Sequence, residues 1–122
     1  NIGRAEAAYE AWKKSIDIDF GAKPRASDGI HFANVGGMWQ EIVFGFSGMV
    51  NVLNTDTLTF NPCIPEEIKR ISYKIMWKGN WFKVSVTANE LELENISDTD
   101  AAFIVKGNNY VVKAGCSKKV TY

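Results

Sequence analysis

The chain has a single histidine, two cysteines and no excess of either charge, and each shortage narrows its possible functions. Lys plus Arg number 14 and Asp plus Glu number 14, so the clustered positive charge typical of nucleic-acid binding is missing. One histidine is too few for a cupin-type metal site, and we expect neither a metal nor a cofactor. The sequence has no apolar run of about 18 residues and no signal-like start. We therefore expect a cytoplasmic protein without a membrane partner, in which Cys63 and Cys116 are reduced thiols.

The first part of the chain has helical periodicity. Ala8, Trp12 and Ile16 recur every four positions and predict a helix from about Arg4 to Ile18, which Phe20-Gly21 ends. A second helix is predicted from about Gly37 to Gly48, with Glu41 as its one charged residue. A helix that is apolar around most of its circumference is expected to be buried in a larger assembly.

The rest of the chain alternates apolar and polar residues, which is typical of strands. Short strands with frequent turns predict a small antiparallel β-sandwich or jelly-roll-like domain over residues 51–122, behind helical residues 1–50. The predicted fold class is therefore α+β, with two N-terminal helices followed by a β-sandwich. Further strands are expected at residues 102–106, 110–114 and 117–122, and the register of the 102–114 hairpin stays open.

The clearest hairpin lies around Gly79-Asn80, which predicts a two-residue type II′ turn. The expected pairs are Trp77 with Phe82, Ile75 with Val84, and Tyr73 with Val86. This register places the large apolar side chains on the core face and leaves Trp81 on the polar face. Farther along, alternating Glu90, Glu92 and Glu94 indicate a solvated strand face.

The loop before the second helix carries the residues best suited to bind an anion. Ser27 offers a hydroxyl and His31, when protonated, a charge-assisted donor, while Gly36 and Gly37 would let an oxyanion approach backbone N–H groups at a helix start. A purely structural interpretation is also open. In it, Ser27 or Asp28 caps the helix, His31 is an ordinary loop histidine, and the glycines serve packing.

Two stretches resemble the end of the catalytic barrel in glycoside hydrolase family 65. They are Ser-Asp-Gly-Ile-His-Phe-Ala-Asn-Val-Gly-Gly-Met-Trp-Gln at residues 27–40 and Val-Phe-Gly-Phe-Ser-Gly-Met at residues 43–49. Residues 58–62, 64–67, 71–75 and 78–86 are similar to the sheet domain that follows the barrel in that family. The resemblance covers most of the chain in the same order.

The resemblance implies that the chain is the C-terminal fragment of an enzyme with an (α/α)₆ barrel. In phosphorylases of the family, inorganic phosphate attacks the anomeric carbon of an α-glucosidic disaccharide with inversion, while a glutamic acid protonates the leaving oxygen. Ser27 and His31 match the family's phosphate-binding serine and histidine, and phosphate would be a co-substrate. The resemblance leaves hydrolysis open as well.

The acid lies upstream in the family, so the resemblance implies no catalytic residue in this fragment, which is expected to be inactive alone. Its partners would be the rest of the barrel, or a second copy bound through the apolar helix. A different hypothesis makes the chain a non-catalytic sugar-binding or assembly module. In that case Trp81, on the polar face of the sheet, would stack on sugar.

Overall fold

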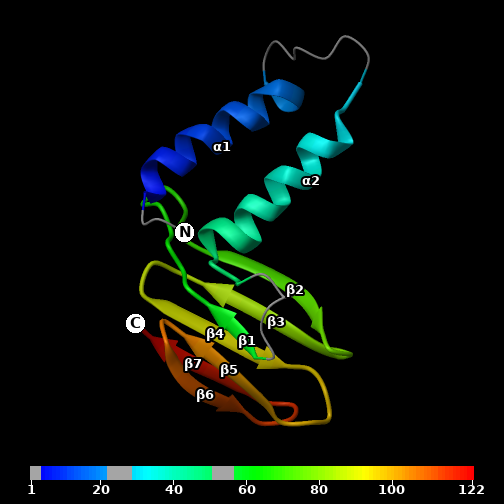
Figure 1. Ribbon diagram of the computed structural model, residues 1–122, viewed down its shortest axis with the longest axis vertical. Coiled ribbons are helices and arrows are strands. Elements are labelled where there is room, and N and C mark those ends of the chain that lie inside the picture. The colour runs from blue at the N-terminus through cyan, green and yellow to red at the C-terminus, as the bar shows by residue number, and fades with distance from the viewer. Residues whose placement is uncertain (1–3, 22–28, 51–56) are drawn as a thin grey trace.

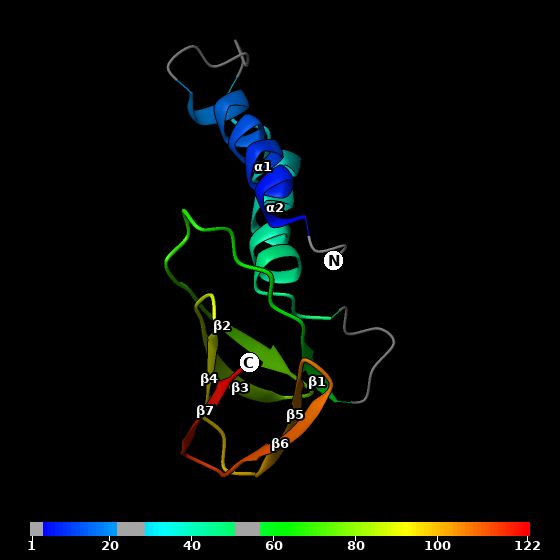
Figure 2. The ribbon, with the colours of Figure 1, turned by 90° about the vertical axis from the view of Figure 1, so that its left-hand side faces the viewer.

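The structure combines a helical hairpin with a two-sheet β-sandwich (Figure 1). It is a computed structural model, and it describes residues 4–21, 29–50 and 57–122. The first helix runs away from the sheets and the second returns toward them, so the hairpin tip is the part farthest from the sandwich (Figures 1 and 2). The predicted α+β class is confirmed.

The first helix, α1, spans Ala5–Phe20 and ends close to the predicted position. Its apolar side faces the second helix and the junction with the sandwich. Trp12 lies on that side, where its ring stacks on Tyr9 with centroids 5.8 Å apart and meets the edge of Phe46 at 6.0 Å. The periodic apolar residues that predict this helix therefore include the one that anchors it.

The second helix, α2, spans Phe32–Gln40 and continues as a π-helical turn, η1, over Glu41–Phe46. The predicted start at Gly37 is wrong, because the helix forms ahead of the glycines. The Val35 N–H already donates to the His31 carbonyl at 3.1 Å, and a glycine inside a helix costs only about 1 kcal/mol relative to alanine. Among the described residues, no helix is long and apolar enough to cross a membrane.

Two facing sheets form the sandwich (Figure 2). The first sheet contains, in spatial order, β1 (Leu58–Phe60), β5 (Ala101–Val105) and β6 (Asn108–Val112). The second contains β2 (Ile71–Trp77), β3 (Asn80–Val86), β4 (Glu90–Asn95) and β7 (Ser117–Thr121). Neighbours pair antiparallel as predicted, except that β1 and β5 run parallel.

The register of the β2–β3 hairpin differs from the predicted one by two residues. Trp77 pairs with Asn80, Ile75 with Phe82, and Tyr73 with Val84. The reason is the turn, whose central residues are Lys78 and Gly79, both with positive φ (47° and 82°), as a type I′ turn requires. A shift of two keeps each side chain on its predicted face, because strand side chains alternate with a period of two.

The β5–β6 hairpin, whose register the sequence left open, uses the same kind of turn. Lys106 and Gly107 have φ of 49° and 82°, and Val105 pairs with Asn108. Both hairpins thus close on a Lys-Gly dipeptide followed by asparagine. The recurrence of Lys-Gly-Asn is the sequence signal that fixes both registers.

The core lies between the two sheets. Phe82 is 1% exposed and Trp77 9%, as predicted, while Trp81 on the opposite face is 49% exposed. Other fully buried side chains are Phe60, Val84, Val86, Leu91, Leu93, Phe103, Val105 and Val112. Each large apolar side chain buried in this way contributes about 1.5–3 kcal/mol.

The glutamates of β4 lie on the outer face of the second sheet, half-buried, as expected of a solvated face. Glu90 lies 3.4 Å from Lys119 and Glu94 lies 3.6 Å from Lys83. Exposed pairs of this kind contribute at most about 1 kcal/mol each.

The end of η1 is built into the sandwich. Val43 and Met49 belong to the buried core, and the fully buried Ser47 hydroxyl lies 2.7 Å from the Tyr73 hydroxyl on β2. Burial raises the pKa of Tyr73 to about 12, and the hydrogen bond to Ser47 opposes part of that rise. The predicted division between residues 50 and 51 adjoins residues 51–56, outside the described part of the chain, and stays a prediction.

Gly48 makes the closest approach in this junction. Its φ is +67°, and its carbonyl accepts a hydrogen bond of 2.7 Å from the Asn61 N–H. A Cβ on residue 48 would lie 2.0 Å from the Asn61 carbonyl oxygen, which is backbone and cannot swing aside. Only glycine fits here, for reasons of both space and backbone conformation.

Gly48→Ala should therefore destabilise the chain by about 3 kcal/mol or more, combining the cost of a left-handed alanine with overpacking. Gly115→Ala is a matched control, because Gly115 has almost the same φ, +66°, but nothing within 4 Å of an added Cβ. We expect it to cost only about 1 kcal/mol. Urea unfolding of both variants measures the difference, and equal losses would contradict the close-packing argument.

Candidate functional site

The structure places only part of the predicted anion loop. His31 is described, whereas Ser27 lies outside the described residues. Gly36 and Gly37 lie within α2 instead of ahead of it. Inside an α-helix each N–H donates to the carbonyl four residues earlier, so these two groups are not at the open helix start. The prediction of a phosphate site therefore depends mainly on Ser27 and His31.

His31 directly precedes α2 as its N-cap residue. The start of α2 is the end of that helix farther from the sheets (Figure 1). Its ring Nδ1 lies 2.8 Å from Oδ1 of Asp19. Its backbone N–H donates to the same oxygen at 3.0 Å. Both contacts are made with the same carboxylate oxygen of Asp19. The His31 side chain is nevertheless 56% exposed. The histidine is thus fixed on one side and open on the other.

Asp19 lies at the end of α1 with its side chain fully buried. Its second oxygen, Oδ2, accepts a hydrogen bond of 2.7 Å from the Asn34 side-chain amide. The same amide donates to the Ser15 carbonyl at 2.9 Å. We call Asp19, His31 and Asn34 the tip cluster. It joins the end of α1 to the start of α2.

These donors hold the pKa of Asp19 below its usual value. The Asn34 amide is the largest cause, the His31 backbone N–H the next, and burial opposes them. Hydrogen bonds of this kind stabilise the carboxylate over the carboxylic acid. Asp19 is therefore an anion at neutral pH, and an anion accepts hydrogen bonds without donating any.

A carboxylate facing Nδ1 determines which ring nitrogen of His31 carries the proton. Because Oδ1 only accepts, Nδ1 must be the donor, and Nε2 is the nitrogen that Asp19 does not engage. Nε2 can accept a hydrogen bond when the ring is neutral and donate one when it is protonated. Both states suit contact with a phosphate group.

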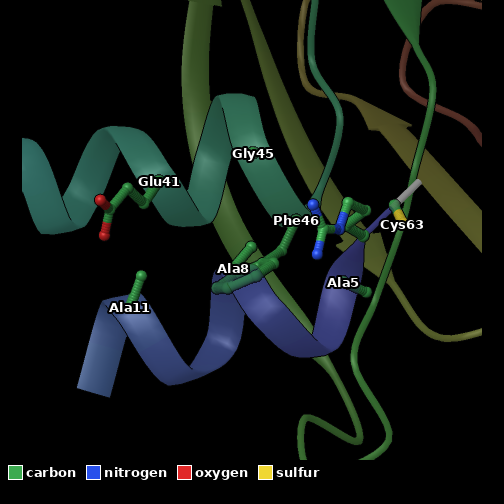
Figure 3. Close-up of a pocket in the computed structure, with 8 residues that line it drawn as sticks. Ala5, Ala8, Ala11, Glu41, Gly45, Phe46 and Cys63 are labelled. Carbon is green, nitrogen blue, oxygen red and sulfur yellow. The ribbon is translucent and has the colours of Figure 1, made fainter. Parts of the chain in front are cut away.

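A well-defined hollow among the described residues lies away from the tip cluster. It is a groove of about 390 Å³ between α1 and η1, near the sandwich (Figure 3). Ala5, Ala8 and Ala11 line one side, while Gly45, Phe46 and Cys63 line another. Glu41 is its one carboxylate. The groove is mostly apolar, and His31 does not line it.

Other predicted groups also lie away from the tip. Trp81 is exposed on the outer sheet face, beside its cross-strand neighbour Met76. Cys63 and Cys116 are free thiols. In the described part of the chain, no three His, Cys, Asp or Glu side chains come together as metal ligands would.

The model of the glycosyl hydrolase family 65 C-terminal domain matches residues 52–112, half of the chain. The chain belongs to glycosyl hydrolase family 65. The family match lies in the sandwich, and it agrees with the resemblance of the β part of the sequence to that family's sheet domain.

Individual relatives of this family 65 chain extend the match into the helical hairpin. A kojibiose phosphorylase of Caldanaerobacter subterraneus subsp. tengcongensis is 35% identical over 108 residues, covering 87% of this chain and 14% of that protein. An alpha,alpha-trehalose phosphorylase of Geobacillus stearothermophilus is 25% identical over 122 residues, covering 99% of this chain and 16% of that protein. The chain thus spans about one seventh of the length of these relatives.

A solved structure confirms the fold. The protein titled "Putative kojibiose phosphorylase from human microbiome" superposes with a TM-score of 0.84, at 20% identity, over 99% of this chain and 17% of that protein. The match includes the helical hairpin as well as the sandwich. Hairpin and sandwich therefore recur together, in this arrangement, within a larger protein.

Sequence reasoning missed Asp19 and Asn34. A signal was present, because Asp19 follows Trp12 by seven residues, two helical turns, and so lies on the face that α1 buries. A carboxylate on a buried helical face needs donors, and the chain's only histidine lies across the loop. The pairing itself required knowing how the two helices align.

Asn34→Ala should raise the Asp19 pKa toward its ordinary value of 3.8, because the variant removes the largest cause that lowers it. Since the folded-state pKa lies below the unfolded one, the stability that Asp19 contributes is fully present above about pH 4. It is lost as pH falls through the lowered folded pKa. Because the Asp19 pKa is lowered less in Asn34→Ala, the variant should lose less free energy of unfolding than wild type when the pH falls from neutral to acid.

A carbon-detected NMR titration of the Asp19 carboxyl, with unfolding in urea at neutral and acid pH, measures both effects. Asn109→Ala removes an exposed asparagine on β6, far from the tip, and is the control. An unchanged Asp19 titration in Asn34→Ala would contradict the proposed cause.

Proposed function

We propose that this chain is the C-terminal part of a family 65 glycoside phosphorylase that cleaves an α-glucosidic disaccharide with inorganic phosphate. In this proposal the helical hairpin is the end of the catalytic barrel, and the sandwich is the domain that follows it. Several relatives are named as kojibiose or trehalose phosphorylases, which supports phosphate over water as the nucleophile.

The tip cluster is the observation that carries the proposal. It holds His31 at the start of α2, where the positive end of the helix dipole also favours an anion. Ser27, four residues earlier in the sequence, would supply a hydroxyl donor. Fixed donors of this kind position a phosphate and partly neutralise its charge, which lowers the barrier to attack.

Gly36 and Gly37 support the proposal through the space they leave. A Cβ built on either residue meets nothing within 4 Å among the described residues, so packing there does not demand glycine. With no side chain at either position, α2 would let a substrate or another segment approach its backbone closely there. Their N–H groups, inside α2, are weaker candidates for phosphate contact than the hydroxyl and the imidazole.

Phosphorolysis with inversion also needs an acid on the opposite side of the sugar. The general acid and the sugar-binding residues would come from the rest of the barrel, and this chain alone would be inactive. Exposed apolar side chains on the hairpin support such a partner: Phe20, Ile30, Phe32 and Trp39 are between 49% and 89% exposed. Barrel helices would cover them in the intact enzyme, and a second copy of the chain would do so in isolation.

The full reading frame that carries this chain provides the test. His31→Ala should raise the KM for phosphate about 10- to 100-fold, because a charge-assisted hydrogen bond contributes about 1.5–3 kcal/mol. The KM for the disaccharide should change little. His31→Gln, which keeps an amide donor, should recover part of the loss.

The matched control for charge is Lys118→Ala, an exposed cation on β7 at the far end of the molecule. It should leave phosphate kinetics unchanged. A phosphate KM that is the same in wild type and His31→Ala would refute the phosphate site.

One observation favours the alternative of a sugar-binding module. Trp81 is 49% exposed and is the cross-strand neighbour of Met76, itself 58% exposed, so two large apolar side chains face solvent side by side on the outer sheet. If the chain binds oligosaccharides there, isothermal titration calorimetry should detect heat that Trp81→Ala abolishes. Trp39→Ala, which removes an equally exposed tryptophan from α2, should leave that heat unchanged. Absence of heat with maltose-type and trehalose-type sugars would exclude the module.

A further inference from the structure

We propose that Asp19 is the positioning residue of the phosphate site: it holds the His31 ring so that Nδ1 carries a proton and Nε2 meets the phosphate. This inference rests on the proposed function, because His31 must contact phosphate for Asp19 to act through it. Asp19 lies on the other helix and is not itself a phosphate ligand, since its buried carboxylate would repel an anion.

The first support is the double contact of one oxygen with one residue. Oδ1 of Asp19 accepts from the His31 backbone N–H at 3.0 Å and from its ring Nδ1 at 2.8 Å. The backbone hydrogen bond fixes the position of the His31 main chain relative to Asp19. The ring hydrogen bond fixes the direction in which the imidazole points. A ring flip that exchanged the two nitrogens would break the second contact, so the plane and the orientation of the imidazole are both set.

The second support is that Asp19 is itself unable to turn. Its side chain is fully buried, and its Oδ2 is held by Asn34, which is anchored in turn on the Ser15 carbonyl. Three donor hydrogens thus converge on the two oxygens of one carboxylate. A buried carboxylate with this many donors stays charged and stays in place.

An amide in place of the carboxylate could not satisfy the same partners. If its oxygen faced His31, its NH₂ would face the Asn34 amide, whose nitrogen already donates to both Ser15 and residue 19. If the amide turned, its NH₂ would face two donors of His31. The cluster is therefore specific for a carboxylate, as in the carboxylate–histidine pairs that orient catalytic bases and metal ligands.

The chemical consequence concerns the phosphate-facing nitrogen. With Nδ1 protonated by necessity, a neutral ring accepts a hydrogen bond at Nε2 from a P–O–H group. A protonated ring instead donates from Nε2 to a P–O⁻ oxygen. In both states the same atom faces phosphate, so the nucleophile is held in one position whatever its protonation state. Without Asp19 the neutral ring would distribute between two tautomers and several orientations.

The tautomer can be measured directly, because the chain has only one histidine. In ¹⁵N-labelled chain at alkaline pH, long-range proton–nitrogen spectra should show Nδ1 protonated and Nε2 bare in wild type. Asp19→Ala should shift the signals toward the mixture seen in a free imidazole. Asp17→Ala, which removes an exposed carboxylate one helical half-turn away on α1, should keep the wild-type spectrum.

A wild-type ring protonated on Nε2 would overturn the inference without any variant, so the test does not depend on Asp19→Ala folding. Circular dichroism of each variant checks that the helices persist. A wild-type spectrum in folded Asp19→Ala would overturn the inference as well.

Kinetics in the full reading frame separate positioning from general structural support. Asp19→Ala should raise the KM for phosphate about tenfold, with little effect on the KM for the disaccharide. In the background of His31→Ala, the same substitution should add nothing further, because Asp19 acts through the ring. Asp17→Ala should match wild type.

The outcomes distinguish this inference from the phosphate site itself. If His31→Ala leaves phosphate kinetics unchanged, the proposed function fails and the inference fails with it. If His31→Ala raises the phosphate KM but Asp19→Ala does not, the inference alone fails. If Asp19→Ala raises the KM equally with and without His31, its role is structural and the inference is overturned.

Discussion

The arrangement of this chain depends on the way its second helix enters the sandwich. Among the described residues, residues 47–49 directly after η1 already contact the sheets. The helix ends as a π turn whose Val43 is part of the core, and after it Met49 joins the core while Gly48 packs against the backbone of Asn61. The direction of the hairpin is thereby set by the sandwich. The position of the hairpin tip, including His31, therefore depends on how this junction packs.

A second constraint acts at the other end of the hairpin. The tip cluster joins α1 to α2 through a buried carboxylate, far from the sheets. The hairpin is thus fixed at both ends, by apolar packing near the sandwich and by charge-assisted hydrogen bonds at the tip. The contacts at the two ends of the hairpin differ in chemistry, because one is buried and the other lies near solvent. The junction is closed off from water, whereas the tip presents a half-exposed imidazole.

Much of this could be predicted from the sequence, because apolar period and turn residues are local signals. The period of α1, the alternation of β2 and β3, and the outward position of Trp81 follow from spacing alone. The resemblance of the loop to family 65 pointed to His31. These predictions use residues close together in the chain, where geometry is set by the backbone.

The rest required tertiary information. The predicted type II′ turn at Gly79-Asn80 was wrong by one position because Lys78 accepts a left-handed conformation that lysine seldom adopts. The start of α2 was missed because two glycines look like a helix boundary, and only the hydrogen bond ahead of them shows otherwise. Asp19 was missed because its partner lies across a loop. A buried carboxylate is visible in the sequence, but the residue that satisfies it is not.

The parallel pairing of β1 with β5 has a consequence for the order of folding. The two Lys-Gly hairpins bring together strands that are neighbours in the chain, so they close short loops and form quickly. Leu58 and Phe103 are far apart in sequence, so the pairing of their strands closes a longer loop, at a higher cost in chain entropy. We therefore expect the two Lys-Gly hairpins to form before β1 pairs with β5.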